Sequence, residues 1–204
     1  MALGKTGYRG CLLGMAVGDA MGYTVDKRSI QEIRRDYGPN GLLGYDLANG
    51  YADVTSYTQI AAFGCNGLLI GVTRSRVLGK KAPLIKYIEL SLREWAVFQN
   101  PYGRPRQSYS WLLRRADMCR RHCMDTRMLE ALARDTQRYP LGTPDQPRNG
   151  YGGPGSLASA IGVGLFFDPD RMSQEETDFL GAEVVALTHG APWPSSAARP
   201  WPIS

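Results

Sequence analysis

The chain has 204 residues, 43% of them hydrophobic, which is enough for a substantial core in one domain. Its net charge of +5 arises mainly in residues 114–127, where acids are interspersed and no aromatic stripe accompanies the bases, so we expect no nucleic-acid partner. No apolar run is long enough to cross a bilayer, so we expect no membrane association. Lys5, Arg9 and residues 11–17 resemble a signal peptide only faintly, because Asp19 and the glycines interrupt the apolar segment, so we expect no export. Four cysteines without a disulfide framework favour the cytoplasm.

The first predicted helix covers about residues 8–23 and carries a stripe of glycines. Gly14, Gly18 and Gly22 recur at every fourth position. Each glycine costs a helix roughly 1 kcal/mol relative to alanine. The stripe therefore predicts close packing against another backbone or a ligand.

The rest of the chain also shows helical periodicity, with no strand ladder and no internal repeat. Ser29, Glu32 and Gly38 form the capping-box and stop pattern of a second helix. Further helices are predicted over residues 56–77, 83–98, 107–122, 125–138 and about 156–166. Ser173 and Glu176 then cap a last helix that is predicted to stop at Gly190.

The expected fold is thus all-α, with one helical domain over residues 1–190 and a Pro/Ser-rich irregular tail over residues 191–204. A glycine- and proline-rich loop over residues 139–156 interrupts the helices, and a loop of this length is typical of functional segments. Cys119, His122 and Cys123 share a predicted basic helix. Without a second pair of ligands, this cluster indicates a surface helix rather than a metal site.

Four motifs occur in an informative order. They are "GCLLGMAVGDAMGYTVD" from residue 10, "TSYTQ" from residue 55, "NGYGGPGSLASAIGVGLFF" from residue 149 and "ALTHG" from residue 186. Together they resemble the ADP-ribosylglycohydrolase family, which includes dinitrogenase-reductase-activating glycohydrolases. The resemblance implies a compact orthogonal helical bundle and hydrolysis of the glycosidic bond that links ADP-ribose to a protein side chain or small molecule. It also implies a site with two magnesium ions, which are hard cations that prefer several oxygen ligands.

The resemblance places one family ligand set, a Thr/Ser-Asp-Asp-Thr run at a helix start, on Thr55, Ser56, Tyr57 and Thr58. Both carboxylates are missing, and the Tyr57 phenol stays protonated near neutral pH. An alternative register brings Asp53 onto the first carboxylate. The family's second set, Asp-x-Asp-Thr near the C-terminus, is absent from the 204 residues. We therefore expect a degenerate, C-terminally shortened member that lacks the C-terminal helices and binds no magnesium or other cofactor.

Other family positions are partly retained. Asp19 matches an aspartate with a structural role, and Asp26 falls where the family has a glutamate near the ribose, which makes it a weak catalytic candidate. His189 matches a histidine that faces the nucleotide ribose. The resemblance assigns ligand binding to this histidine and to a glycine-rich loop, namely Asn149, Gly150, Gly152, Gly153 and Gly155. The family's Met-Arg pair falls on Ala158 and Ser159, so a phosphate-binding cation is missing there.

From the residues alone, simpler interpretations remain open. The glycine loop is explained by a flexible connection, His189 by a helix C-cap, Asp19 by a helix salt bridge and Asp26 by a solvent-facing acid. Three functions follow. The chain is an inactive or weak glycohydrolase relative that binds ADP-ribose or an ADP-ribosylated protein, or an active hydrolase that uses Asp46 and Asp53. The third is a non-catalytic interaction module, whose exposed helical face is covered by a second copy or a protein partner.

Overall fold

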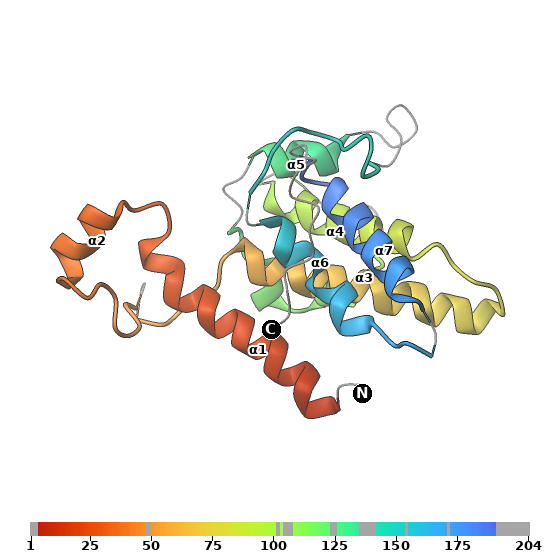
Figure 1. Cartoon of the computed structure of the whole chain (residues 1–204), viewed down its shortest axis with the longest axis horizontal. Coiled ribbons are helices and arrows are strands. Elements are labelled where there is room, and N and C mark those ends of the chain that lie inside the picture. Colours follow the sequence, from red (N-terminus) through yellow and green to blue (C-terminus); the bar gives the residue numbers. More distant parts are fainter. Residues whose placement is uncertain are drawn as a thin grey trace.

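The chain is helical, as the sequence predicts. The computed structural model describes residues 4–47, 50–100, 103, 108–122, 126–134, 142–153, 155–170 and 172–190. Over these residues it contains seven α-helices, three short 3₁₀-helices and no strand (Figure 1). The all-α prediction is confirmed. The tail predicted over residues 191–204 lies outside the described residues.

The element bounds agree with most of the predicted helices. In chain order the elements are α1 (Lys5–Gly22), η1 (Tyr23–Val25), α2 (Ile30–Tyr37), α3 (Ser56–Leu78), α4 (Leu84–Gln99), η2 (Trp111–Arg114), η3 (Ala116–Cys119), α5 (Thr126–Ala133), α6 (Gly155–Phe166) and α7 (Gln174–Ala186). Both predicted capping boxes are present, at the starts of α2 and α7. Helix α7 ends at Ala186, before the predicted stop at Gly190.

The helix predicted over residues 107–122 is wrong. Two 3₁₀-helices and irregular backbone occupy the described part of this segment. The buried Glu94 carboxylate of α4 accepts hydrogen bonds from the backbone N–H groups of Tyr109, at 2.6 Å, and Ser110, at 2.7 Å. A charged acceptor in the core thus binds N–H groups at the start of the segment and fixes it against α4. Consequently Cys119 and His122 do not share a helix, and Cys123 lies outside the described residues.

Helix α3 is the centre of the bundle. It packs against α4 and α6, while α7 packs against α6 and α5 against α4 (Figure 1). The core side chains include Ile60 and Phe63 of α3, Trp95 of α4 and Val184 of α7, each at most 1% exposed. At Gly67 the helices α3 and α4 approach so closely that an added Cβ would lie 2.5 Å from the Cα of Ile88.

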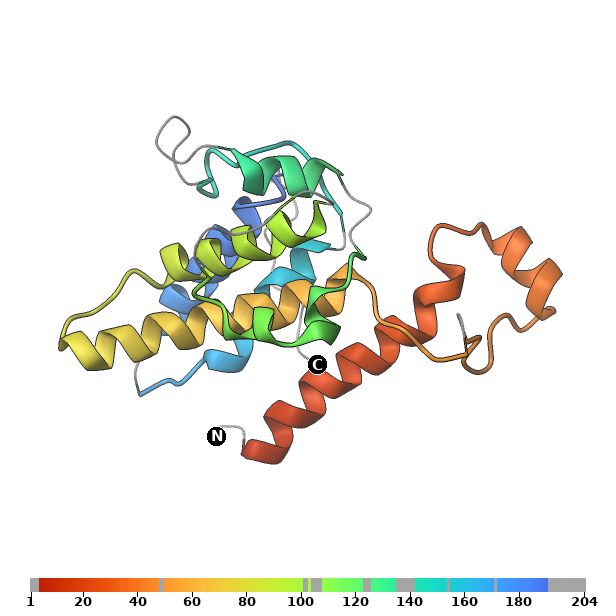
Figure 2. The ribbon, with the colours of Figure 1, turned by 180° about the vertical axis from the view of Figure 1, so that it is seen from behind.

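Helices α1 and α2 form an N-terminal arm, residues 5–37, that extends beyond this bundle. Figure 2 shows α2 at the far end of the arm, away from α3 to α7. Ala20 is the buried residue of α1, whereas Leu13 is 61% and Val17 54% exposed. An added Cβ at Gly10, Gly14, Gly18 or Gly22 would meet no atom within 4 Å. Within the described residues, no other element of this chain packs against the glycine stripe. No helix among them is both long and apolar enough to span a membrane.

The two kinds of glycine give opposite expectations for alanine substitution. Gly14→Ala should raise the free energy of unfolding by about 0.5–1 kcal/mol, because it adds helix propensity without a clash. Gly67→Ala should lower it by about 1–3 kcal/mol or more, because the new methyl group meets backbone atoms. Urea unfolding followed by circular dichroism measures both. A destabilised Gly14→Ala protein would mean that another surface packs against the stripe.

Candidate functional site

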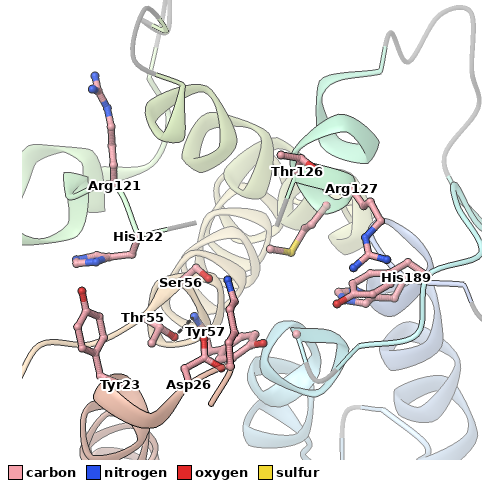
Figure 3. A pocket seen from close by; sticks show the side chains of 14 residues that line it. Tyr23, Asp26, Thr55, Ser56, Tyr57, Arg121, His122, Thr126, Arg127 and His189 are labelled. Atoms are coloured by element: carbon pink, nitrogen blue, oxygen red, sulfur yellow. Dashed lines mark hydrogen bonds between the residues drawn. The ribbon is translucent and has the colours of Figure 1, made fainter. Parts of the chain in front are cut away.

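A cavity of about 490 Å³ lies where the bend of the N-terminal arm meets the starts of α3, α5 and α6 (Figure 3). This volume is in the range of small-molecule sites. Its wall is formed by Tyr23, Asp26, Lys27, Thr55, Ser56, Tyr57, Arg121, His122, Thr126, Arg127, Met128, Tyr151, Gly155 and His189. The structure thus brings together six residues that the sequence singles out from distant segments: Asp26, Thr55, Ser56, Tyr57, Gly155 and His189.

The floor of the cavity is the start of α3, and Asp19 of α1 holds it. The Asp19 carboxylate accepts hydrogen bonds from the backbone N–H of Thr55 at 2.9 Å and of Thr58 at 3.2 Å. It also accepts one from each threonine hydroxyl, both at 2.6 Å. The Thr55 oxygen in turn caps α3 by accepting from the Tyr57 N–H at 3.1 Å. The helix dipole favours a negative charge at this N-terminus. Because Asp19 belongs to α1, its hydrogen bonds join the N-terminal arm to the bundle at this point.

The two other acids considered from the sequence lie elsewhere. The Asp53 carboxylate is 3.3 Å from Nη1 of Arg120 and 3.7 Å from Nε2 of His122, and it is not part of the cavity wall. Tyr51 and Asp53 raise the pKa of the Arg120 guanidinium, so this cation stays charged. Asp46 accepts a hydrogen bond from the Tyr37 hydroxyl in a separate hollow beside α2. Asp26 is thus the carboxylate that reaches the cavity among the described lining residues.

One side of the cavity is a three-layered stack. The Arg127 guanidinium carbon lies 3.6 Å from the centre of the Tyr151 ring. The Tyr151 ring stacks on His189 with 5.1 Å between centroids and 27° between planes. His189 is buried, and its Nδ1 lies 2.7 Å from the Thr188 hydroxyl. An added Cβ at Gly155 would lie 3.2 Å from the His189 ring and 3.4 Å from the Tyr57 ring, so glycine permits this approach.

The glycine-rich loop contributes to the cavity mainly through Tyr151 and Gly155. The Asn149 amide donates to the Thr188 carbonyl at 2.7 Å, and its oxygen accepts from the Tyr151 N–H at 3.0 Å. The Tyr151 carbonyl also accepts from the Gly190 N–H at 2.9 Å. Asn149 therefore ties the loop to the end of α7. Asn149, Gly150, Gly152 and Gly153 are not part of the cavity wall.

The opposite side depends on buried amides in the core. Nε2 of Gln59 donates to the Arg120 carbonyl at 2.8 Å, and its oxygen accepts from the Trp95 indole at 3.0 Å. The Gln99 oxygen accepts from the His122 N–H at 3.0 Å. These bonds fix the segment that carries Arg121 and His122 at the cavity.

Sequence reasoning missed six charged or aromatic residues of the wall as site residues: Tyr23, Lys27, Arg121, His122, Arg127 and Tyr151. Arg121 and Arg127 were visible only as part of a basic stretch, which predicts a solvated surface. Tyr151 stands inside the glycine-rich motif, so an aromatic residue within a predicted binding loop was the available signal.

Replacement of Asp19 tests its place at the start of α3. Asp19→Asn removes the negative charge and directs an amide N–H₂ group at the threonine donors. We expect the free energy of unfolding to fall by about 1.5–3 kcal/mol, the usual range for hydrogen bonds to a charged group. The matched control Asp170→Asn, at an exposed loop position, should change it by less than about 0.5 kcal/mol. Equal effects of both variants in urea unfolding would contradict this role of Asp19.

Comparison with known proteins identifies the family. No curated protein and no solved structure matches the chain. The model of the ADP-ribosylglycohydrolase family, however, matches residues 5–199, nearly the whole sequence. The four-motif resemblance is thereby confirmed, and the chain belongs to the ADP-ribosylglycohydrolase family.

Proposed function

We propose that this chain binds the ADP-ribose group of a modified protein or small molecule but has lost all or most of its hydrolytic activity. The observation that carries the proposal is the start of α3. There, the positions aligned with the family's two acids are Ser56 and Tyr57, and both line the cavity. The Thr55 hydroxyl, at the head of the same run, donates its hydrogen bond to Asp19.

Magnesium does not fit this set of side chains. A magnesium ion needs near-octahedral oxygen ligands and is held in proteins mainly through carboxylates. The described residues contain no group of three or more His, Cys, Asp or Glu side chains that could hold a metal ion. In the described cavity wall the one carboxylate, Asp26, is accompanied by the cations Lys27, Arg121 and Arg127. No step of hydrolysis through a metal is therefore assigned to this chain.

Retained binding is supported by the parts of the cavity that keep family character. His189 and Gly155 remain at one wall and Asp26 at another, and the volume of about 490 Å³ suits a small organic ligand. The histidine and Tyr151 form an aromatic surface, which can contact a sugar face or a base. We assign ligand contact to Asp26, Gly155 and His189, and a supporting role to Asn149.

Separate assays of binding and turnover test this function. Isothermal titration with ADP-ribose should give a measurable affinity. Incubation with proteins ADP-ribosylated on arginine or on serine, in excess magnesium chloride, should release no ADP-ribose above background. Turnover that EDTA abolishes would contradict the proposal.

A matched variant shows whether the missing acids explain the lost turnover. Ser56→Asp combined with Tyr57→Asp restores the family's run at the start of α3. We expect this double variant to gain magnesium binding by titration, whereas Thr58→Asp, which adds an acid beside Asp19, should gain none. Equal magnesium binding by the unaltered chain and the double variant would contradict the argument.

The exposed face of α1 supports a second candidate function, self-association. Leu13 and Val17, four residues apart on α1, are each more than half exposed. An apolar face of this kind is typical of interaction sites, and a second copy of the chain is the occupant that we propose.

Light scattering tests this second candidate. The purified chain should have the mass of a dimer, and Val17→Glu should shift it to the monomer because a charge would be buried at the interface. Phe179→Glu, at a position of α7 that is 58% exposed and so close to Val17 in exposure, is the control and should leave the dimer intact. A monomeric unaltered chain would exclude this candidate.

A further inference from the structure

We propose that Lys27 and Arg127 bind the diphosphate of the ligand directly, so that ligand binding by this chain requires no divalent metal. The inference rests on the proposed function, because it takes an ADP-ribose type of ligand as the occupant of the cavity. It assigns the phosphate contacts to two side chains that belong to none of the four family motifs in the sequence.

The charge of the cavity is the first argument. Its described lining residues carry the cations Lys27, Arg121 and Arg127 against a single carboxylate, Asp26. A recess with an excess of one charge sign concentrates ligands of the opposite sign, here an anion. The same excess opposes entry of a divalent cation. In Figure 3 the Arg121 side chain is directed away from the other labelled residues, whereas Arg127 lies beside His189. This leaves Arg127 and Lys27 as the anion-binding pair.

The fixed position of Arg127 is the second argument. Its guanidinium group lies 3.6 Å from the centre of the Tyr151 ring, and Tyr151 is itself stacked on the buried His189. Stacking fixes the plane of the guanidinium group. Such a group is suited to bidentate hydrogen bonding with phosphate oxygens. Because the side chain is already ordered, less conformational entropy is lost when the anion binds.

The backbone of Lys27 is the third argument. Its φ of 66° makes Lys27 the non-glycine residue with positive φ among the described residues. Lysine rarely adopts this left-handed conformation, which favours glycine and asparagine. Strained backbone of this kind tends to occur at functional sites, where the surrounding structure maintains it. Here the strain accompanies a charged side chain in the cavity wall, between Asp26 and the start of α2.

Titration calorimetry with EDTA present is the central experiment. The probes are inorganic pyrophosphate, ADP-ribose and, as an uncharged control, ribose. We expect pyrophosphate and ADP-ribose to bind and to compete with each other, and ribose alone to bind far more weakly. Replacing EDTA with magnesium chloride should change the Kd by less than about threefold, and added sodium chloride should weaken binding because the contacts are ionic.

Two positions supply the variants. Arg127→Ala should weaken the binding of both anions by about tenfold or more, the size expected for a lost charged hydrogen bond. Arg76→Ala, an exposed arginine at the far end of α3, should leave the Kd unchanged. Lys27→Gly should weaken binding to a similar extent while raising the Tm, because glycine relieves the backbone strain. Lys27→Arg should keep the affinity of the unaltered chain.

The outcomes separate this inference from the function on which it rests. ADP-ribose binding that EDTA abolishes would overturn the metal-free inference but leave ligand binding established. Pyrophosphate binding without any ADP-ribose binding would support the cation pair and overturn the proposed function. An unchanged Kd in both Arg127→Ala and Lys27→Gly would overturn the assignment of the phosphate contacts, even if ADP-ribose binds.

Discussion

The Asp19 carboxylate is the interaction on which the site depends. It accepts four hydrogen bonds from Thr55 and Thr58, two from backbone N–H groups and two from hydroxyls. These bonds connect α1, whose other turns are largely exposed, to α3, which lies at the centre of the bundle. The bend that follows α1 carries Asp26 and Lys27, so the same carboxylate also determines where that side of the cavity lies.

The side chains that a pair of magnesium ions requires and the side chains that line this cavity differ in the sign of their charge. A pair of magnesium ions requires carboxylates around it, but the described wall offers three cations and one carboxylate. Acids at both Ser56 and Tyr57 would bring the wall to three carboxylates against three cations, so their loss alone leaves an excess of positive charge. This excess, with one of the cations stacked on Tyr151, fits the proposed site for an anionic ligand without the metal. This view joins the proposed loss of hydrolysis to the proposed metal-free binding.

Local signals in the sequence predict most of the fold and only part of the site. Capping boxes at Ser29 and Ser173 involve residues three apart, and both helix starts are confirmed. The segment after α4 could not be predicted in this way, because Glu94 fixes it through contacts between residues at least fifteen positions apart. The glycine stripe of α1 is a second case in which a local pattern does not identify the contacting partner. The low helix propensity of glycine indicates that something compensates for it, but it does not indicate which surface lies opposite the glycine.

The uncharged start of α3 has a consequence for the life of the protein in a cell. Three carboxylates gathered at Asp19, Ser56 and Tyr57 would repel one another and would require bound ions for the region to be stable. With a serine and a tyrosine at two of these places, Asp19 and the Thr55 hydroxyl accept the hydrogen bonds of the backbone N–H groups at the helix start. If this chain binds no magnesium, as we propose, its folded population should be independent of the supply of divalent ions, and chelation should leave the amount of native protein unchanged.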